Sequence, residues 1–331
     1  MSAKYSRIIS TGSALPAARI TNEDLARRLA ADGIETSDEW IRTRTGIEAR
    51  RFVNGTTETT TTLAAAAAQK AFEGGGVDPK TIDLIIVATT TPDQVFPSTA
   101  AAVQRLIGAA GCAAFDVQAV CAGFIYALNA ADAMLRAGPY QRALVIGAET
   151  MSRVIDMKDR ATCVLFGDGA GAVVLEASAK PGILAARMYA DGSYDENVLG
   201  LTARIDHGEL CGRPYINMDG RQVFKLAVDG LTSSAQEVAV LAGVDPQDVD
   251  VYIPHQANLR IMTMVAKKLG IPDERMIKTV SEQGNTSAAS VPLALDEAVR
   301  SGKISDGSLV LLQAVGAGMA WGSAIVRWRS E

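Results

Sequence analysis

The sequence contains few aromatic residues, few histidines and few cysteines, and each shortage excludes a class of protein. Aromatic residues make up 5% of its 331 residues, so Ala, Val, Ile and Leu must build the core, which disfavours an aromatic-rich β-sandwich. The two histidines, His207 and His255, lie in no cluster with the spacing of metal ligands, and we expect no metal site. The four cysteines form no C-x-x-C pair, which in a chain of this length favours reduced thiols and a cytoplasmic location.

An excess of basic residues is also absent. The chain has 32 Lys and Arg against 37 Asp and Glu, a formal net charge of −5. It therefore lacks the overall positive charge of a nucleic-acid-binding protein, and an acidic partner would need a local basic patch. Apolar residues make up 48% of the chain and charged residues 21%, as in ordinary globular proteins, which excludes extended disorder.

No segment predicts secretion or membrane insertion. The N-terminal stretch MSAKYSRIISTGSALP lacks the apolar core of a signal peptide. Gly307–Val326 carries no formal charge and is long enough to cross a bilayer, but Gly316–Gly318 interrupts it. We expect instead two buried strands, Leu309–Leu312 and Ala324–Trp328, joined by a glycine-rich turn.

Strands and helices alternate along the chain, which predicts an α/β fold of packed layers. Asp83–Ala88 and Ala143–Gly147 are almost entirely apolar, as expected of strands buried on both faces. Further strands are predicted at Ala114–Gln118, Ala170–Leu175 and Val251–Pro254. A short helix capped by Thr21 or Asn22 is predicted with Leu25 and Leu29 on one face. Further helices are predicted at Leu63–Phe72, Ser98–Ile107, Ala122–Arg136, Val223–Ala242, Gln256–Leu269 and Ser290–Arg300. Residues 190–222 are rich in Gly, Asp and Asn and are expected to form a long irregular excursion.

One short pattern occurs twice. The sequence GVDP at 76–79 precedes the predicted strand at Asp83, and GVDP at 243–246 precedes Asp250–Pro254 at the same offset. Such a connector can recur by chance, but the order of the elements that follow it is also repeated. We therefore predict an internal duplication with halves at 1–180 and 181–331, and a cleft where the halves meet.

Cys121 is the first candidate for catalysis. It follows the predicted strand Ala114–Gln118 and opens the predicted helix Ala122–Arg136, where the positive end of the helix dipole and unpaired N–H groups favour a thiolate. A cysteine in such a position can act as a nucleophile. The alternative is a buried cysteine with a purely structural role, as most free cysteines have.

His255 and Asn285 are the other two candidates. His255 ends a predicted strand at a junction of the kind where ligands collect, although lone histidines are more often structural. Asn285 lies in a turn-like stretch before Ser290–Arg300, where an asparagine usually serves its own backbone. With Cys121, these residues would place a nucleophile, a base or donor, and a neutral donor at the edge of one cleft.

Five stretches of the sequence resemble a single family. They are DEWIRTRTGIEARR, FDVQAVCAGF, FGDGAGAVVL, IPHQANLRI and GNTSAASVP, in that order, and the resemblance runs from about Arg7 to Trp328. The family is β-ketoacyl-acyl-carrier-protein synthase III, which initiates fatty-acid synthesis on the thiolase-like condensing-enzyme fold. The resemblance implies two duplicated α/β halves forming a layered αβαβα sandwich, with the cysteine in the first half and the histidine and asparagine in the second.

The resemblance also implies a reaction. Cys121 would take an acyl group, usually acetyl, from acyl-coenzyme A; malonyl-acyl carrier protein would then lose CO2 and attack the acyl-enzyme, giving a 3-oxoacyl product. His255 and Asn285 would donate N–H groups to the enolate oxygen, and the backbone N–H groups of Cys121 and Ala317 would bind the acyl oxyanion. The family commonly has a glycine run at this place, so Ala317 is a departure. No cofactor is implied, because coenzyme A thioester is a substrate.

Further binding residues follow from the same resemblance. Trp40 and Arg160 would stack on the adenine of coenzyme A, with Arg44 near the phosphates and Asn258 toward the pantetheine. Phe96 would cross a homodimer interface and cap the partner's acyl pocket, unless it is an ordinary core residue. The other acyl-pocket candidates are Phe166, Leu201 and Met218. A basic patch would bind the acidic acyl carrier protein, and it comprises Lys225, Arg260, Lys267 and Lys268.

Other assignments remain open. A cysteine followed by a histidine and an asparagine also suits papain-like proteases, but their C-G-[SA]-C-[WY] signature is missing. Elongating synthases use two active-site histidines, and thiolases carry a second cysteine near the last glycine-rich turn; neither feature is present here. A non-catalytic subunit would be expected to have lost Cys121 or His255. A sister condensing enzyme with another acyl primer, as in alkylquinolone or polyketide starter synthesis, is the remaining alternative, because the sequence does not fix the acyl donor.

Overall fold

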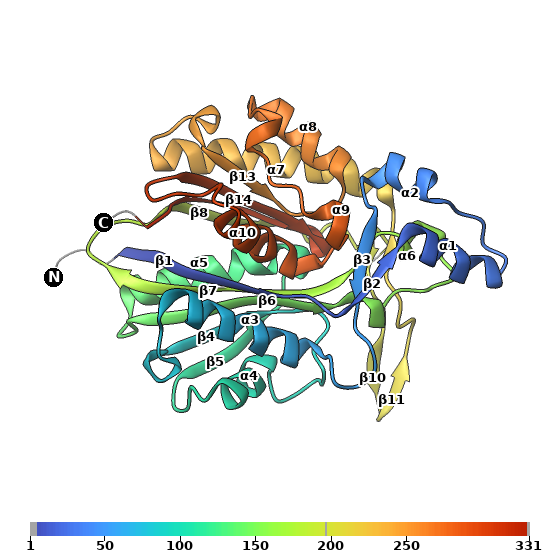
Figure 1. Ribbon diagram of the computed structural model, residues 1–331, viewed down its shortest axis with the longest axis horizontal. Coiled ribbons are helices and arrows are strands. Elements are labelled where there is room, and N and C mark those ends of the chain that lie inside the picture. Colours follow the sequence, from blue (N-terminus) through green and yellow to red (C-terminus); the bar gives the residue numbers. More distant parts are fainter. Residues whose placement is uncertain (1–4, 196, 330–331) are drawn as a thin grey trace.

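Two β-sheets form the frame of the molecule, and helices lie between them and over both outer faces (Figure 1). The computed structural model describes residues 5–195 and 197–329. The first sheet has the order β1-β7-β6-β4-β5 and the second the order β13-β14-β15-β8. The layers alternate as αβαβα, which confirms the predicted fold class.

The first sheet is built around strands that are buried on both faces. β4 (Leu84–Ala88) pairs in parallel with β5 (Ala113–Val117) and β6 (Arg142–Thr150), and its five residues are all fully buried. β7 (Asp168–Ser178) runs antiparallel to β6 and to the edge strand β1 (Tyr5–Ala14). The continuous apolar runs in the sequence therefore mark the central strands, as expected.

The second sheet repeats most of this order. β13 (Val251–Pro254) pairs in parallel with β14 (Leu309–Gly316), which is followed by the antiparallel strands β15 (Ala320–Arg327) and β8 (Ile183–Ala190). A single parallel bridge from Tyr252 to Met276 replaces the pairing that β5 makes with β4. The two strands expected within the uncharged C-terminal stretch are thus β14 and β15. Among the described residues, no helix has the length and apolarity needed to cross a membrane.

Three pairs of helices form the other layers (Figure 1). The pair α3 (Thr60–Gly75) and α4 (Thr99–Ile107) covers the outer face of the first sheet. Between the sheets lie α5 (Gly123–Ala137) and α10 (Ser290–Arg300), which share a hydrophobic core with strands of both sheets. The outer face of the second sheet is covered by α7 (Gly220–Ala242) and α8 (Leu259–Leu269).

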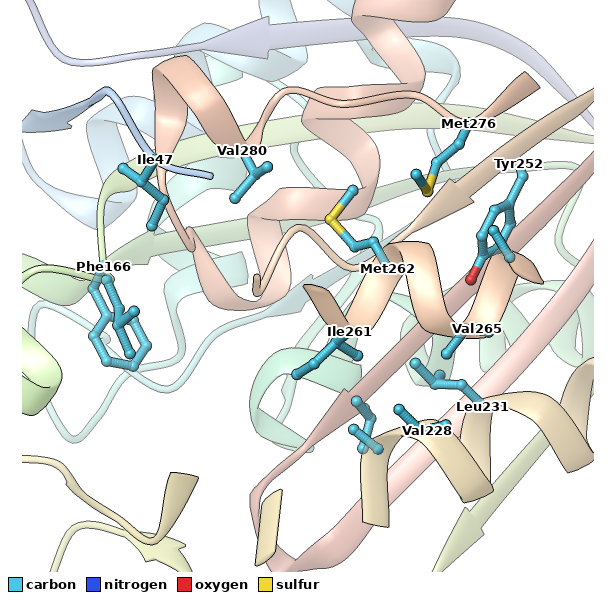
Figure 2. Packing of buried hydrophobic residues seen from close by; sticks show 14 of the residues in the cluster. Ile47, Phe166, Val228, Leu231, Tyr252, Ile261, Met262, Val265, Met276 and Val280 are labelled. Atoms are coloured by element: carbon cyan, nitrogen blue, oxygen red, sulfur yellow. The ribbon is translucent and has the colours of Figure 1, made fainter. Parts of the chain in front are cut away.

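The two outer helices of the second sheet pack closely on each other. Figure 2 shows Ile261 and Val265 of α8 facing Val228 and Leu231 of α7, with Tyr252 of β13 nearby. These residues recur at intervals of three or four along each helix, which places them on one face and leaves the charged residues outside. The N-terminal end of α8 is thereby held beside the end of β13.

The repeated GVDP pattern has the same local structure in both halves. Gly76 and Gly243 end α3 and α7 in the left-handed conformation that glycine adopts without strain, at φ of 60° and 70°. Asp78 and Asp245 then cap short 3-10 turns, and β4 and β13 follow. The repeat is therefore structural, and the core between the two sheets combines residues of both halves.

Several elements lie outside the predicted set. Both antiparallel edge strands, β1 and β8, were missed. The excursion after residue 190 contains two short strand pairs, β9 (Leu199–Gly200) with β12 (Asn217–Met218) and β10 (Arg204–Asp206) with β11 (Glu209–Cys211). The pair formed by β10 and β11 projects from the body of the molecule (Figure 1). The other elements outside the predicted set are β2 (Ala18–Thr21), β3 (Ala49–Phe52), α2 (Asp38–Thr45), α6 (Arg160–Cys163) and α9 (Val280–Gln283). The short helix expected around Leu25 and Leu29 is α1 (Asn22–Ala31), which Thr21 caps and which buries both leucines.

Candidate active site

Cys121, His255 and Asn285 all line one cavity, which has a volume of about 800 Å³. Cys121 comes from the segment after β5, His255 from the end of β13, and Asn285 from the turn after α9. The backbones of Gly316 and Ala317, between β14 and β15, complete this part of the lining. The cavity therefore collects the three candidate side chains from both halves of the chain.

Cys121 lies in a short 3-10 turn that leads directly into α5. The preceding Val120 has a φ of 47°, a strained conformation for a β-branched residue, of the kind that is found at functional sites. The Cys121 side chain is buried, and burial raises the pKa of its thiol to about 12, with the buried Glu149 carboxylate adding to the shift and the Ser287 hydroxyl opposing it. The prediction of a thiolate in the resting enzyme is therefore wrong, because desolvation outweighs the helix N-terminus.

His255 is held at the end of β13 by its backbone and by its ring. Its N–H donates to the carbonyl of Gln313 at 2.7 Å, and its Nδ1 lies 2.6 Å from Oγ of Ser290. Burial lowers the pKa of His255 to about 3, so the imidazole is neutral at physiological pH. A neutral imidazole carries one N–H group, through which it can donate a hydrogen bond to a ligand.

Asn285 is fixed by three hydrogen bonds that leave its amide NH2 free to face the cavity. Its N–H donates to Leu165 O at 2.8 Å, and its carbonyl accepts from Gly167 N at 2.9 Å. Its side-chain Oδ1 accepts the backbone N–H of Ser287 at 2.9 Å. With Oδ1 engaged, the Nδ2 group is the part of the side chain available to a ligand, and it can only donate.

Sequence reasoning missed a buried network behind the cysteine. Glu149, at the end of β6, is fully buried and accepts hydrogen bonds from the hydroxyls of Thr89–Thr91 and from the backbone N–H groups of Thr90 and Thr91. Its Oε1 also accepts Ser287 Oγ at 3.0 Å, and Ser287 itself has a φ of 49°. Burial raises the pKa of Glu149. The only signal in the sequence was an acidic residue closing an otherwise apolar strand.

The glycine-rich turn after β14 approaches the cysteine backbone directly. A Cβ added at Gly316 would lie 2.6 Å from the backbone nitrogen of Cys121, so only glycine fits there. The residue with positive φ is Gly318, at 99°, whereas Ala317 is not in that region. The alanine that departs from the family pattern is therefore compatible with the backbone of the turn.

The residues expected to bind coenzyme A lie close together, with both arginines stacked on the ring of Trp40. The guanidinium carbons of Arg44 and Arg160 each lie 4.5 Å from the centroid of the Trp40 ring. Asn258 caps α8, lines the cavity and donates through Nδ2 to the carbonyl of Arg44 at 3.2 Å. An adenine between Trp40 and Arg160 needs van der Waals contact of about 3.5 Å on each face. The expected sandwich thus requires Arg160 to move away from Trp40.

The acyl-pocket candidates separate into two groups. Phe166, Leu201 and Met218 line the cavity. Phe96 does not, because its side chain is 82% exposed beside Val95, which is 74% exposed. Phe96 is therefore neither part of the wall of its own chain's cavity nor an ordinary core residue, and a role across a dimer interface stays a prediction.

The four basic candidates are exposed on α7 and α8. Only Arg260 of the four lines the cavity, and its guanidinium lies 6.0 Å from the ring centroid of Phe224. Lys267 and Lys268 lie about 10 Å further along α8, given a rise of about 1.5 Å per residue, and Lys268 pairs with Asp229 at 3.3 Å. The patch thus extends from the mouth along the helix. Among the described residues, no group of three or more His, Cys, Asp and Glu could hold a metal ion.

Solved structures of known proteins match this architecture over nearly the whole chain. A family model described as 3-oxoacyl-[acyl-carrier-protein] synthase III matches residues 115–192, and the model of the C-terminal part of the same family matches residues 240–328. The chain is similar to the solved 3-oxoacyl-[acyl-carrier-protein] synthase III of Aquifex aeolicus VF5, with 47% identity, a TM-score of 0.90, and coverage of 98% of this chain and 100% of that one.

Two further solved structures are similar over the same length. The enzyme of Pseudomonas aeruginosa PAO1 that bears the same name is 37% identical, with a TM-score of 0.90 and 98% of both chains covered. The priming β-ketosynthase of the R1128 polyketide biosynthetic pathway is 36% identical, with a TM-score of 0.92 and coverage of 98% of this chain and 97% of that one. The 3-oxoacyl group is the β-ketoacyl group under another name, so these findings agree with the resemblance in the sequence.

Proposed function

Because the chain belongs to the 3-oxoacyl-acyl-carrier-protein synthase III family, and is therefore a condensing acyltransferase, we propose the residues and substrates with which it initiates fatty-acid synthesis. Cys121 takes an acyl group from acetyl-coenzyme A or another short acyl-coenzyme A. Malonyl-acyl carrier protein then condenses with this acyl group, and the products are 3-oxoacyl-acyl carrier protein, CO2 and coenzyme A. The observation that carries the proposal is the single cavity lined by Cys121, His255 and Asn285.

In the first stage, the Cys121 sulfur attacks the thioester carbonyl. The new C–S bond forms first, the bond to the coenzyme A sulfur then breaks, and the thiol proton ends on the departing sulfur. Since the Cys121 thiol is protonated at rest, no net proton acceptor is needed. The backbone N–H groups of Cys121 and Ala317 bind the oxyanion that develops between these two events, and the close approach of Gly316 to Cys121 supports this assignment.

In the second stage, the malonyl group loses CO2 and negative charge develops on its thioester oxygen. His255 and Asn285 each donate an N–H group to this oxygen, and each such donor is worth roughly 3 kcal/mol in the transition state. The neutral imidazole and the engaged Oδ1 of Asn285 support these roles. The resulting carbanion attacks the acyl group on Cys121, and the cysteine sulfur leaves as a thiolate that takes up a proton from water to restore the thiol.

Incubation with acyl-coenzyme A is expected to add one acyl group to the intact protein, measured by mass spectrometry. The adduct should be absent in Cys121→Ala, and addition of malonyl-acyl carrier protein should discharge it. A panel of acyl-coenzyme A thioesters identifies the primer. Stable acylation that malonyl-acyl carrier protein cannot discharge would favour the sister enzyme of another starter synthesis, and persistent acylation of Cys121→Ala would contradict the assignment of the nucleophile.

We further propose that the chain acts as a homodimer in the cytoplasm. β5 pairs with β4 alone among the described strands, and its residues are half-buried, so its other edge can pair with a second copy. The exposed Val95 and Phe96 lie after β4, and Phe96 then caps the acyl pocket of the second copy. All four cysteines are free, which suits a reducing compartment. Light scattering is expected to give twice the chain mass, and a monomer would contradict the proposal.

We place the docking of the acidic carrier protein on Lys225, Arg260, Lys267 and Lys268. The double variant Lys267→Glu/Lys268→Glu is expected to raise KM for malonyl-acyl carrier protein severalfold, an effect that weakens with added salt. Transfer from acetyl-coenzyme A should be unchanged. Lys70→Glu/Lys80→Glu is the matched control, because these exposed lysines belong to α3 and the turn after it, on the other sheet. Equal effects on both substrates would refute the docking site.

A further inference from the structure

Ser290 lies behind the ring of His255 and does not itself line the cavity. It is the first residue of α10 and is fully buried. Its Oγ lies 2.6 Å from Nδ1 of His255 and 3.3 Å from the backbone nitrogen of Gln256. One hydroxyl is thus shared between the imidazole and the N–H group of the next residue.

The chemistry of these three groups fixes the direction of both hydrogen bonds. The backbone N–H of Gln256 can only donate, so Ser290 Oγ accepts from it. The hydroxyl proton still needs an acceptor, and His255 Nδ1 is the one within reach among the described residues. If Nδ1 carried a proton and donated it instead, the buried hydroxyl proton would have no acceptor, which buried polar groups avoid.

We propose that Ser290 is a positioning residue that holds His255 in the tautomer with its proton on Nε2. Nδ1 accepts from the hydroxyl, and the opposite ring nitrogen, Nε2, faces the cavity as an N–H donor. This inference rests on the proposed role of His255 as a donor to the enolate oxygen. It adds that Ser290 makes the ring a donor, and it excludes Nε2 as the base that deprotonates Cys121.

The backbone around His255 is rigid without Ser290, so the hydroxyl can be removed selectively. The Gln256 side chain is fully buried, and its Nε2 donates to Pro254 O at 2.7 Å and to Ile277 O at 3.1 Å. Its Oε1 accepts the N–H groups of Thr279 and Val280 at 2.8 and 3.1 Å. Loss of the Ser290 hydroxyl should therefore release the tautomer while the ring keeps its place.

The tautomer can be read directly by NMR of protein labelled with ¹⁵N-histidine. The chain contains only two histidines, and His207 has a side chain that is 98% exposed, so it serves as the internal reference. Wild-type His255 should show a protonated Nε2 and an unprotonated Nδ1 at neutral pH. A protonated Nδ1, or an even mixture of tautomers, would overturn the proposal without any variant or activity assay.

Ser290→Ala provides the second test. We expect a mixture of His255 tautomers and a decarboxylation rate for malonyl-acyl carrier protein that falls about tenfold or more, with acyl transfer to Cys121 within about twofold of wild type. Ser234→Ala is the matched control, because Ser234 is a buried serine whose Oγ lies 2.7 Å from Ser323 Oγ, away from the cavity. An unchanged tautomer in Ser290→Ala would refute the role of the hydroxyl. Failure of wild-type acylation would instead refute the proposed function, and the NMR result would still decide on Ser290.

Discussion

Asn285→Asp is expected to lower the rate of malonyl-acyl carrier protein decarboxylation by about 100- to 1,000-fold, because it removes one of the two donors that we propose for the enolate oxygen. The new side chain keeps the oxygen that accepts Ser287 N–H, so the turn should keep its conformation. It replaces the NH2 group with a second oxygen, which as a carboxylate can only accept and which repels the developing negative charge. Acyl transfer to Cys121, which does not use this donor, should change little.

The two half-reactions, measured separately by release of CO2 and by mass of the acyl-enzyme, provide the internal control. Asn54→Asp, which adds the same charge at an exposed position, should affect neither. The defect should grow as pH rises, since a protonated carboxyl can still donate and an ionised one cannot. A variant that loses both half-reactions equally would show that Asn285 supports the fold of the site instead of the enolate.

The sequence predicted that Cys121, His255 and Asn285 lie at one cleft, as the structure shows, because the signals for them are local. Cys121 and His255 each follow the carboxyl end of a strand, where ligands collect in α/β proteins. The two strands belong to different sheets, so the structure was needed to show that their ends meet at one cavity. The helix Ser290–Arg300 was predicted with its observed bounds, which placed Asn285 just ahead of it. The family resemblance then assigned roles to these positions, whereas spacing alone left each of them with a structural alternative.

The edge strand β1 was missed for a physical reason. Its residues Ser6 and Thr11 are buried, but their hydroxyls donate to Asp132 of α5 at 2.8 Å and to Asp296 of α10 at 2.7 Å. Polar residues satisfied by partners more than a hundred positions away hide the alternation that marks a strand. The same holds for Glu149 and Ser287, whose pairing spans 138 residues.

The ionisation of Cys121 was predicted wrongly for a related reason. A helix N-terminus is visible in the sequence, and it favours a thiolate. The depth of burial and the neighbouring Glu149 carboxylate are visible only in three dimensions, and both raise the pKa of the thiol. A local signal pointed to Cys121, and the surrounding structure decides the pKa of its thiol.

Gly316→Ala is expected to impair both half-reactions, by about 100-fold or more, because its Cβ would meet the backbone nitrogen that we propose as an oxyanion donor. The added carbon would lie 2.6 Å from Cys121 N and 3.0 Å from Ala119 O and Ala122 N. Contacts this short force the turn and the cysteine apart, which moves the backbone donors and the nucleophile together. Overpacking of a buried contact should also lower the free energy of unfolding by about 1–3 kcal/mol.

Acylation of Cys121 and urea unfolding measure these two effects. The loss arises from contact and not from backbone strain, because Gly316 has a φ of −143°, which alanine adopts freely. Gly192→Ala is therefore the matched control, since a Cβ there meets nothing within 4 Å and should leave activity and stability unchanged. Asn285→Asp and Gly316→Ala then separate the two oxyanion sites: the first variant should lose decarboxylation alone, and the second should lose acyl transfer as well. Normal acylation in Gly316→Ala would mean that the thioester oxygen binds elsewhere than between Cys121 and Ala317.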